Sequence, residues 1–248
     1  MIVGSKSIFL VTVIAVLFQY GECTISAWAT PVIATADGGN GALATKVDDG
    51  ATSATGITIA ATSDASITAY TKVSQTPSDV VFAIANTGVL TISSGTLTYS
   101  TNSVYTLVIS ATDSAGTVTA TVTLSVNDKP AFAATNYGKC IADKAAAGTT
   151  LTTLTASDAV NGGSLTYSID SGNTDTDFEI NTSGRIKTLN AMDAATVGGY
   201  KLVLHADDSS LTGTTTVWVL VADCSSGAAA LLAGMMTLLM AITTMVLH

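Results

Sequence analysis

Short runs of alternating apolar and polar residues recur along most of this chain, and they predict β-strands. From Val118 to Leu124, apolar residues occupy every second position and threonines fill the positions between them. Because successive side chains of a strand point to opposite faces, one face of this strand is expected to be buried and the other to carry hydroxyl groups. Similar β-branched runs occur at 57–60, 104–109 and 217–221, with turn signals such as Thr87-Gly88 and Ser183-Gly184 between runs.

Two motifs occur twice in the chain. A phenylalanine precedes a glycine at Phe82 to Gly88 and again at Phe178 to Gly184, an offset of 96 residues. A tyrosine-led run that ends in aspartate occurs at Tyr105 to Asp113 and at Tyr200 to Asp208, an offset of 95 residues. The repeat unit is therefore a whole domain. With about seven strands in each repeat, the sequence predicts an all-β protein of two tandem Greek-key β-sandwiches.

The predicted domain borders follow from the repeat and from the chain ends. The boundary between the sandwiches falls at 127–130, where Pro130 stops one strand, so the domains are expected at 24–128 and 129–223. Residues 1–23 resemble a signal peptide, because Lys6 precedes an apolar run at 8–18 that is too short to span a bilayer comfortably. An uncleaved anchor is the alternative.

The other end of the chain is also strongly apolar. Small residues after Cys224 lead into an apolar run that continues to Leu247, with no basic residue behind it. This pattern predicts that 224–248 is a signal for a glycosylphosphatidylinositol (GPI) anchor; a retained membrane anchor and a buried helix are alternatives. Both ends together predict the secretory pathway and the extracellular face of the plasma membrane.

Composition excludes several classes of function. The net charge is −9 with only nine lysines and arginines, which argues against nucleic acid as a partner and is compatible with divalent cations. The only histidines are His205, in a predicted strand, and His248. No nucleophile motif, zinc-ligand spacing or paired carboxylates stand out, so we expect no enzyme.

Covalent features fit a secreted chain. Cleavage of the signal peptide would leave Cys140 and Cys224, and in an oxidising compartment a bridge between them is favoured over two free thiols. The bridge requires the Cys140 segment to reach the end of the domain that holds Cys224. Asn181-Thr-Ser183 is an N-glycosylation sequon at a predicted surface turn. The alternating acids at 173–179 lack the glycine of a calcium loop and predict a solvated hairpin tip.

The second repeat resembles cadherin domains. The resemblance lies in motifs that occur in order along about 95 residues: Pro130-Ala-Phe132, Ile141-Ala-Asp143, Leu154-Thr-Ala156-Ser-Asp158, Phe178-Glu-Ile180, Met192-Asp193, Tyr200-Lys-Leu202 and Ala206-Asp-Asp208. The first repeat matches more weakly, mainly from Ile57 to Asp128. The resemblance implies extracellular adhesion or recognition, with another cell-surface or matrix protein, or a second copy of the chain, as partner. The alternative is a structural coat or matrix protein.

In the cadherin family these motifs hold calcium at the junction between consecutive domains. Carried over by position, the resemblance implies a Ca²⁺ site at Asp49, Asn127, Asp128, Asp158 and Asp208. Several family acids are replaced here, by Thr98-Tyr-Ser100, Ser125, Val160 and Ala195. We therefore expect one residual site in place of three. The alternative is that these aspartates only cap turns at strand ends.

Overall fold

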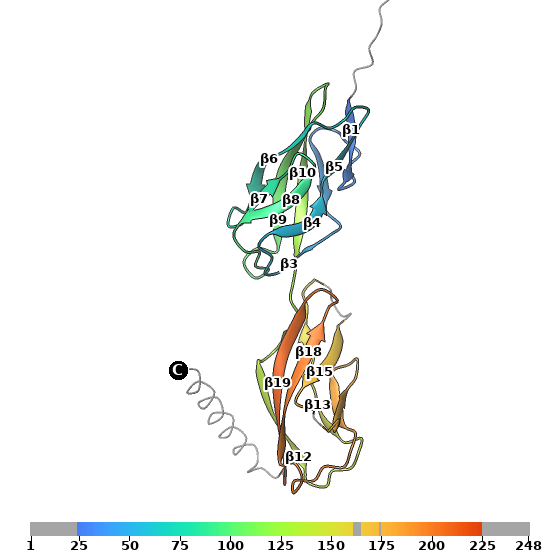
Figure 1. Cartoon of the computed structure of the whole chain (residues 1–248), viewed down its shortest axis with the longest axis vertical. Helices are drawn as coiled ribbons and strands as arrows, with labels where there is room; N and C mark the ends of the chain where they lie inside the picture. Colours follow the sequence, from blue (N-terminus) through green and yellow to red (C-terminus); the bar gives the residue numbers. More distant parts are fainter. Residues whose placement is uncertain (1–23, 161–164, 174, 225–248) are drawn as a thin grey trace, which may run out of the picture.

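The computed structural model describes residues 24–160, 165–173 and 175–224. Within these residues every regular element is a β-strand, which confirms the all-β prediction. The strands build two units that stack end to end, as Figure 1 shows. The predicted signal peptide and all but the first residue of the predicted tail, Cys224, lie outside the described residues. In the described part of the chain no helix is long and apolar enough to cross a membrane.

The first unit is a sandwich of two sheets. One sheet has the strand order β2-β10-β9-β6, and β3 also pairs with β10. The other layer consists of β1-β5 and β4-β8-β7, where β5 follows β4 after the single residue Ile59. The strands of this unit are β1 (Ile25–Thr30), β2 (Gly39–Ala42), β3 (Val47–Asp48), β4 (Ala54–Thr58), β5 (Ala60–Ser63), β6 (Ala69–Thr76), β7 (Val81–Ile84), β8 (Val89–Ser94), β9 (Val104–Thr112) and β10 (Thr117–Asn127).

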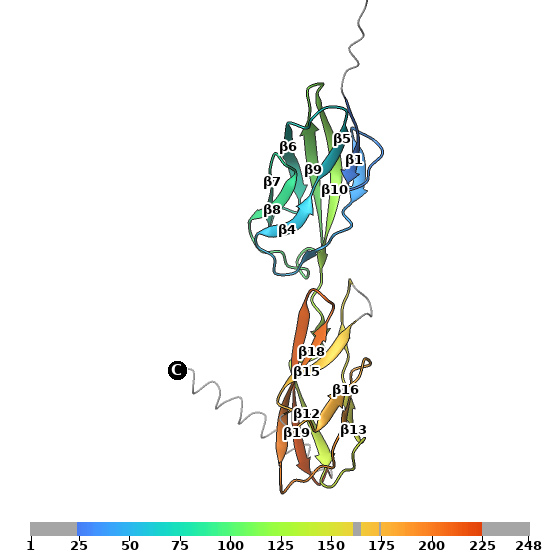
Figure 2. The ribbon, with the colours of Figure 1, turned by 45° about the vertical axis from the view of Figure 1, so that its right-hand side comes forward.

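The second unit repeats this topology. Its first sheet has the order β12-β19-β18-β15, and the opposite layer consists of β11-β14 and β13-β17-β16. Its strands are β11 (Ala131–Phe132), β12 (Asn136–Ala142), β13 (Thr150–Thr153), β14 (Ala156–Ser157), β15 (Thr166–Ser171), β16 (Phe178–Ile180), β17 (Arg185–Thr188), β18 (Gly199–Asp207) and β19 (Thr212–Ala222). Figure 2 shows both sandwiches from a second direction.

The repeated aromatic residues lie on equivalent strands. Phe82 of β7 packs edge-on against Tyr105 of β9 with ring centroids 5.3 Å apart, and Phe178 of β16 packs against Tyr200 of β18 at 4.9 Å. All four side chains are buried, and each pair belongs to the hydrophobic core of its own unit. The two repeats therefore share one packing arrangement, as the duplicated motifs predict.

Each of these tyrosines donates a hydrogen bond to an aspartate. Tyr105 bonds Asp79 at 2.9 Å, and Tyr200 bonds Asp177 at 2.5 Å. Burial and the neighbouring Asp79 raise the pKa of Tyr105 to about 12, and burial and the neighbouring Asp177 raise the pKa of Tyr200. The prediction of a solvated hairpin tip at 173–179 is wrong for Asp177, which is buried and accepts a hydrogen bond from the Tyr200 hydroxyl.

A disulfide joins Cys140 to Cys224, with Cα atoms 5.7 Å apart. Strand β12 runs parallel to β19 over seven consecutive residue pairs, from Asn136 opposite Thr216 to Ala142 opposite Ala222. This long pairing carries Cys140 to the end of the unit where Cys224 leaves β19. The predicted bridge is thus present, and the geometric condition on it is met.

Candidate junction site

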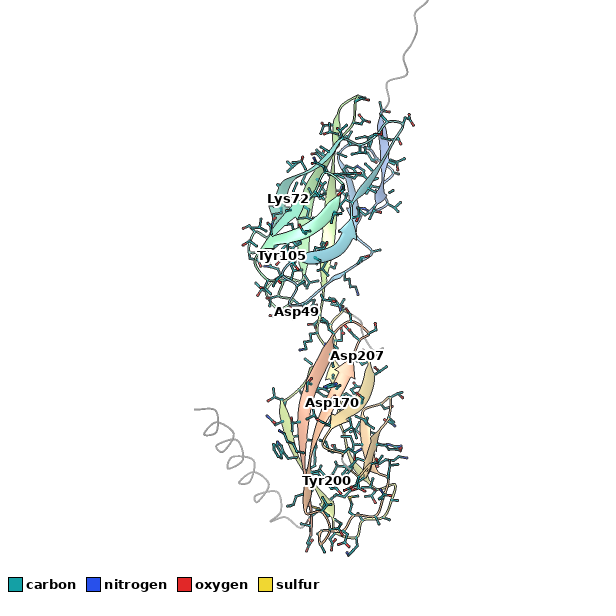
Figure 3. The ribbon with its side chains drawn as sticks, in the orientation of Figure 1. Asp49, Lys72, Tyr105, Asp170, Tyr200 and Asp207 are labelled. Carbon is teal, nitrogen blue, oxygen red and sulfur yellow. A yellow bond between two sulfur atoms is a disulfide. The ribbon has the colours of Figure 1, made fainter. Side chains whose placement is uncertain are left out.

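The junction between the two units is the place where the sequence predicts a binding site. Strands β3 and β10 bring Asp48 and Asn127 to the lower end of the first unit, because Asn127 lies opposite Asp48 in the parallel pairing of these strands. The turn between β18 and β19 brings Asp208 and Ser210 to the upper end of the second unit. Figure 3 labels Asp49 and Asp207 on the two sides of this junction.

Asn127 connects the two units through its side-chain amide. Its Nδ2 donates to Asp48 Oδ1 at 3.1 Å and to Asp208 Oδ2 at 3.0 Å. The residue is 4% exposed, although it belongs to the segment that links the two sandwiches. A buried amide that bonds a carboxylate on each side makes charge-assisted hydrogen bonds, which are stronger than neutral ones.

Ser210 makes a second connection between the units. Its Oγ donates to Asp48 Oδ2 at 2.6 Å, so both oxygens of Asp48 accept hydrogen bonds. The other oxygen of Asp208, Oδ1, accepts the backbone N–H groups of Ser210 at 2.8 Å and Leu211 at 2.6 Å. These bonds fix the turn that presents Ser210 to the first unit. We call Asp48, Asn127, Asp208 and Ser210 the junction network.

The other aspartates of the predicted calcium site lie around this network with different partners. Asp49 Oδ1 accepts the backbone N–H of Tyr99 at 3.0 Å, within the first unit. Asp128 Oδ2 accepts the N–H of Ala159 at 3.2 Å, and Asp158 Oδ1 accepts the N–H of Val160 at 2.8 Å. The bond to Val160 makes Asp158 the cap of its own turn, whereas Asp49 and Asp128 each accept an N–H group from a residue distant in the sequence.

Two carboxylates of the junction network, from Asp48 and Asp208, lie on either side of the Asn127 amide. The two carboxylate oxygens that share the Asn127 amide are each about 3 Å from Nδ2, so they lie no more than about 6 Å apart. Oxygens that bind one Ca²⁺ lie within about 5 Å of each other. Among residues 24–160, 165–173 and 175–224, no three histidine, cysteine, aspartate or glutamate side chains are grouped as metal ligands.

Two members of the network were missed in the sequence. The sequence predicts Asp49 at the junction, whereas the structure places Asp48 there. Strand β3 has only two residues, so no alternation of apolar and polar positions shows which aspartate faces the junction. Ser210 was missed because a serine beside Asp208 is ordinary turn composition. The available signal was the run Asp207-Asp-Ser-Ser210, which places several short polar side chains at one turn.

The junction and the repeated sandwiches define the class of this molecule as a tandem all-β protein with a polar linker. Comparison with known proteins gives the type of domain: residues 140–222 match the family model of the cadherin domain. The chain is also 31% identical over 157 residues to Protocadherin Fat 4 of Mus musculus, a match that covers 58% of this chain and 3% of that protein. The chain therefore carries a cadherin-like domain and spans a very small part of this relative's length.

Solved cadherin structures are among the structural matches. Repeats EC22-24 of mouse Cadherin-23 align with a TM-score of 0.40 and 22% identity, covering 81% of this chain and 65% of that one. Repeats EC1-4 of Drosophila N-cadherin align with a TM-score of 0.38 and 22% identity, covering 72% and 48%. The fold of this chain is defined by the strand pairing described above.

Proposed function

We propose that this chain is a membrane-tethered extracellular adhesion or recognition protein whose two cadherin-like units act as one extended arm. The observation that carries the proposal is the match of residues 140–222 to the cadherin domain in a unit stacked end to end with a second sandwich of the same topology. An elongated tandem presents its far unit away from the membrane, where it meets a protein on another cell or in the matrix.

The junction network supports an arm whose two units are held at a fixed angle. Asp48 of the first unit and Asp208 of the second are joined through one amide, and Ser210 bonds across the same gap. Each of these bonds constrains the angle between the units without a metal ion. This supports the second candidate, a structural coat or matrix protein that does not depend on calcium, as well as the first.

Calcium binding at the junction is a separate part of the proposal. Asp48, Asp208 and Asn127 would hold the ion, which would neutralise two carboxylates and draw the units together. If the ion binds, calcium at a hundred times its dissociation constant should stabilise the chain by about 2.7 kcal/mol and raise the melting temperature. The measurement is a calorimetric melt of the chain with millimolar calcium and with a chelator.

The repeat provides a matched control for this measurement. Asp208→Asn should abolish the calcium effect, whereas Asp113→Asn, at the equivalent turn of the first unit, should keep it. Asp113 accepts backbone N–H groups of Ala115 and Gly116 as Asp208 accepts those of Ser210 and Leu211. If calcium does not change the melting temperature of the wild-type chain, calcium binding at the junction is excluded. The hydrogen bonds of the junction network would then be what constrains the angle between the units.

The adhesion proposal itself is tested by binding. Cells that lack other adhesion proteins are made to display the full chain. They should capture beads coated with extracellular matrix or with proteins from cell surfaces. Cells that display an unrelated β-sandwich should not capture these beads. Capture that is no greater than with the unrelated sandwich would favour the coat or matrix candidate.

The same cells test N-glycosylation. Asn181 is exposed at the turn before β17 and should carry a glycan. Glycosidase treatment should lower the mass of the wild-type chain and leave the mass of the Asn181→Gln variant unchanged.

A further inference from the structure

The second unit has a surface cavity beside the glycosylation sequon. The volume of this cavity is about 420 Å³. Pockets that hold small ligands usually measure about 300–1,000 Å³. Two of the three sequon residues, Thr182 and Ser183, form part of the wall, and residues 155–158, Leu165 and Tyr167 form the rest.

The residues of the wall are of the kind that binds a sugar. Thr155, Ser157 and the two sequon residues carry hydroxyl groups, which both donate and accept hydrogen bonds, and Asp158 carries a carboxylate that accepts them. The C–H groups on the faces of a sugar ring are slightly positive and pack against the negative face of an aromatic ring, here Tyr167. Within the described part of the chain no lysine or arginine lines the cavity, so a neutral ligand is favoured over an anion.

Tyr167 is held in place before any ligand arrives. Its hydroxyl accepts the backbone N–H of Ala156 at 3.0 Å. Its ring packs edge-on against Phe132, with ring centroids 6.2 Å apart. Because both ends of the side chain are fixed, little conformational entropy is lost when a ligand packs against the ring.

The first unit is closed at the corresponding place. The Tyr70 hydroxyl accepts the N–H of Ala61 at 2.8 Å, as the Tyr167 hydroxyl accepts an N–H in the second unit, so the two tyrosines are equivalent. Tyr70 packs against Trp28 and is only 7% exposed. In the second unit the smaller Phe132, on a strand of two residues, lies beside the tyrosine, and Tyr167 is half-buried. The tyrosine is therefore more accessible in the unit that carries the sequon.

We propose that this cavity binds the first sugar residues of an N-linked glycan on Asn181, an inference that rests on the proposed function because such a glycan is added in the secretory pathway. Asn181 Oδ1 accepts the backbone N–H groups of Ser183 and Arg185, both at 3.0 Å. Glycosylation replaces a hydrogen on Nδ2 and leaves Oδ1 as an acceptor, so these two bonds persist in the glycosylated chain. The glycan thus starts from a fixed side chain, one residue away from the cavity wall.

The covalent link makes a weak contact sufficient. A sugar attached at the rim is present at a high effective concentration in the cavity, so it binds without the loss of freedom that a free ligand incurs. In the cavity it contacts residues 155–158, 165–167 and 182–183, which are distant from one another in the sequence. The bound sugar therefore stabilises the folded second unit, because these segments are together only when the unit is folded.

The test measures the melting temperature of the second unit in the full chain produced by secreting cells. Three forms of the same polypeptide are compared: with the intact glycan, with the glycan trimmed to one N-acetylglucosamine, and with the glycan removed enzymatically. Enzymatic removal leaves an aspartate that still accepts the two turn bonds. The intact and trimmed forms should melt alike, and removal should lower the melting temperature by about 4 °C or more. In nuclear magnetic resonance spectra the protons of the first sugar should shift upfield, because they lie over the ring of Tyr167.

Two variants separate the cavity from a general effect of glycosylation. Tyr167→Leu removes the ring; whatever its own cost, it should abolish the difference in melting temperature between the glycosylated and deglycosylated forms. The matched control is Ala85→Asn, which creates a sequon with Thr87 at the equivalent turn of the first unit. Tyr70 lies beside that turn and is buried, so a glycan there should leave the melting temperature of the first unit unchanged.

Several results would overturn the proposal. If removal of the glycan does not change the melting temperature, the sugar does not bind in the cavity. Stabilisation of the Tyr167→Leu variant by the glycan as large as that of the wild-type chain, or equal stabilisation of the first unit in the Ala85→Asn variant, would show a general effect of glycosylation. An unoccupied Asn181 would overturn the proposal as well. The adhesive function is decided separately by the capture of beads, which none of these measurements uses.

Discussion

Two glycines at equivalent turns show how single residues set this fold. Gly88 and Gly184 have positive φ angles of +84° and +72°. A Cβ at either position would lie 2.1 Å from the carbonyl oxygen of Ile59 or 2.0 Å from that of Leu154. These oxygens belong to backbone that cannot move away easily, so the repeated glycine is required by close approach as well as by its φ angle.

We predict that Gly184→Ala lowers the free energy of unfolding by roughly 3 kcal/mol or more, because the turn must shift. Gly148→Ala is the control: Gly148 has φ +83° but no atom within 4 Å of the added Cβ. It should cost only about 1–2 kcal/mol for the left-handed backbone. Denaturant titration of the second unit's transition measures both. Equal losses would show that the backbone conformation, and not the contact with Leu154, requires glycine.

The two buried tyrosines predict a loss of stability at alkaline pH. Burial and hydrogen bonding to Asp79 raise the pKa of Tyr105 to about 12, above the value of about 10 in an unfolded chain. The Tyr105 hydroxyl therefore keeps its proton to a higher pH in the folded state than in the unfolded state. The stabilisation is complete below about pH 10 and is lost as the pH rises towards 12. Unfolding titrations between pH 9 and 12 should show this decline. Tyr105→Phe should remove the contribution of the first unit, and a slope unchanged in that variant would contradict the assignment.

At the scale of elements, the pairing of β12 with β19 brings Cys140 next to Cys224, so that a disulfide can join them. The disulfide joins residues 84 positions apart and encloses nearly the whole second unit. A crosslink over a loop of this length limits the unfolded chain and contributes about 4 kcal/mol.

We therefore predict that the double variant Cys140→Ser, Cys224→Ser lowers the denaturant midpoint of the second unit and leaves that of the first unchanged. Fluorescence reports the units separately, because Trp28 is buried in the first and Trp218 lies on β19 of the second. Adding reductant to the wild-type chain should give the same shift. A shift of both transitions would mean that the two units unfold as one.

At the scale of the whole molecule, the proposed membrane tether would decide where the two units act. The proposal takes the apolar segment within 224–248 as a signal for a GPI anchor. Treating cells that display the chain with a phosphatidylinositol-specific phospholipase should release it into the medium. A chain that stays in the membrane fraction and keeps His248 would instead carry a retained anchor. A transmembrane protein displayed on the same cells is the control.

The sequence by itself determined the class of fold and the duplication. Alternation at 118–124 predicts a strand with one buried face, and the structure has apolar residues inside and threonines outside. Phe82, Tyr105 and their repeats predict two similar cores because large aromatic side chains must be buried together. These features are local or repeated along the chain, so the amino-acid sequence alone is enough to predict them.

The junction network was decided only by the tertiary structure. Asn127 bonds partners 79 and 81 residues away, and Ser210 bonds Asp48 across 162 residues. Side-chain hydrogen bonds act over about 3 Å, so they depend on strand ends that the chain brings together only after folding. The choice of Asp48 over Asp49 and the burial of Asp177 have the same origin: each depends on which way the side chain faces and on what lies opposite it.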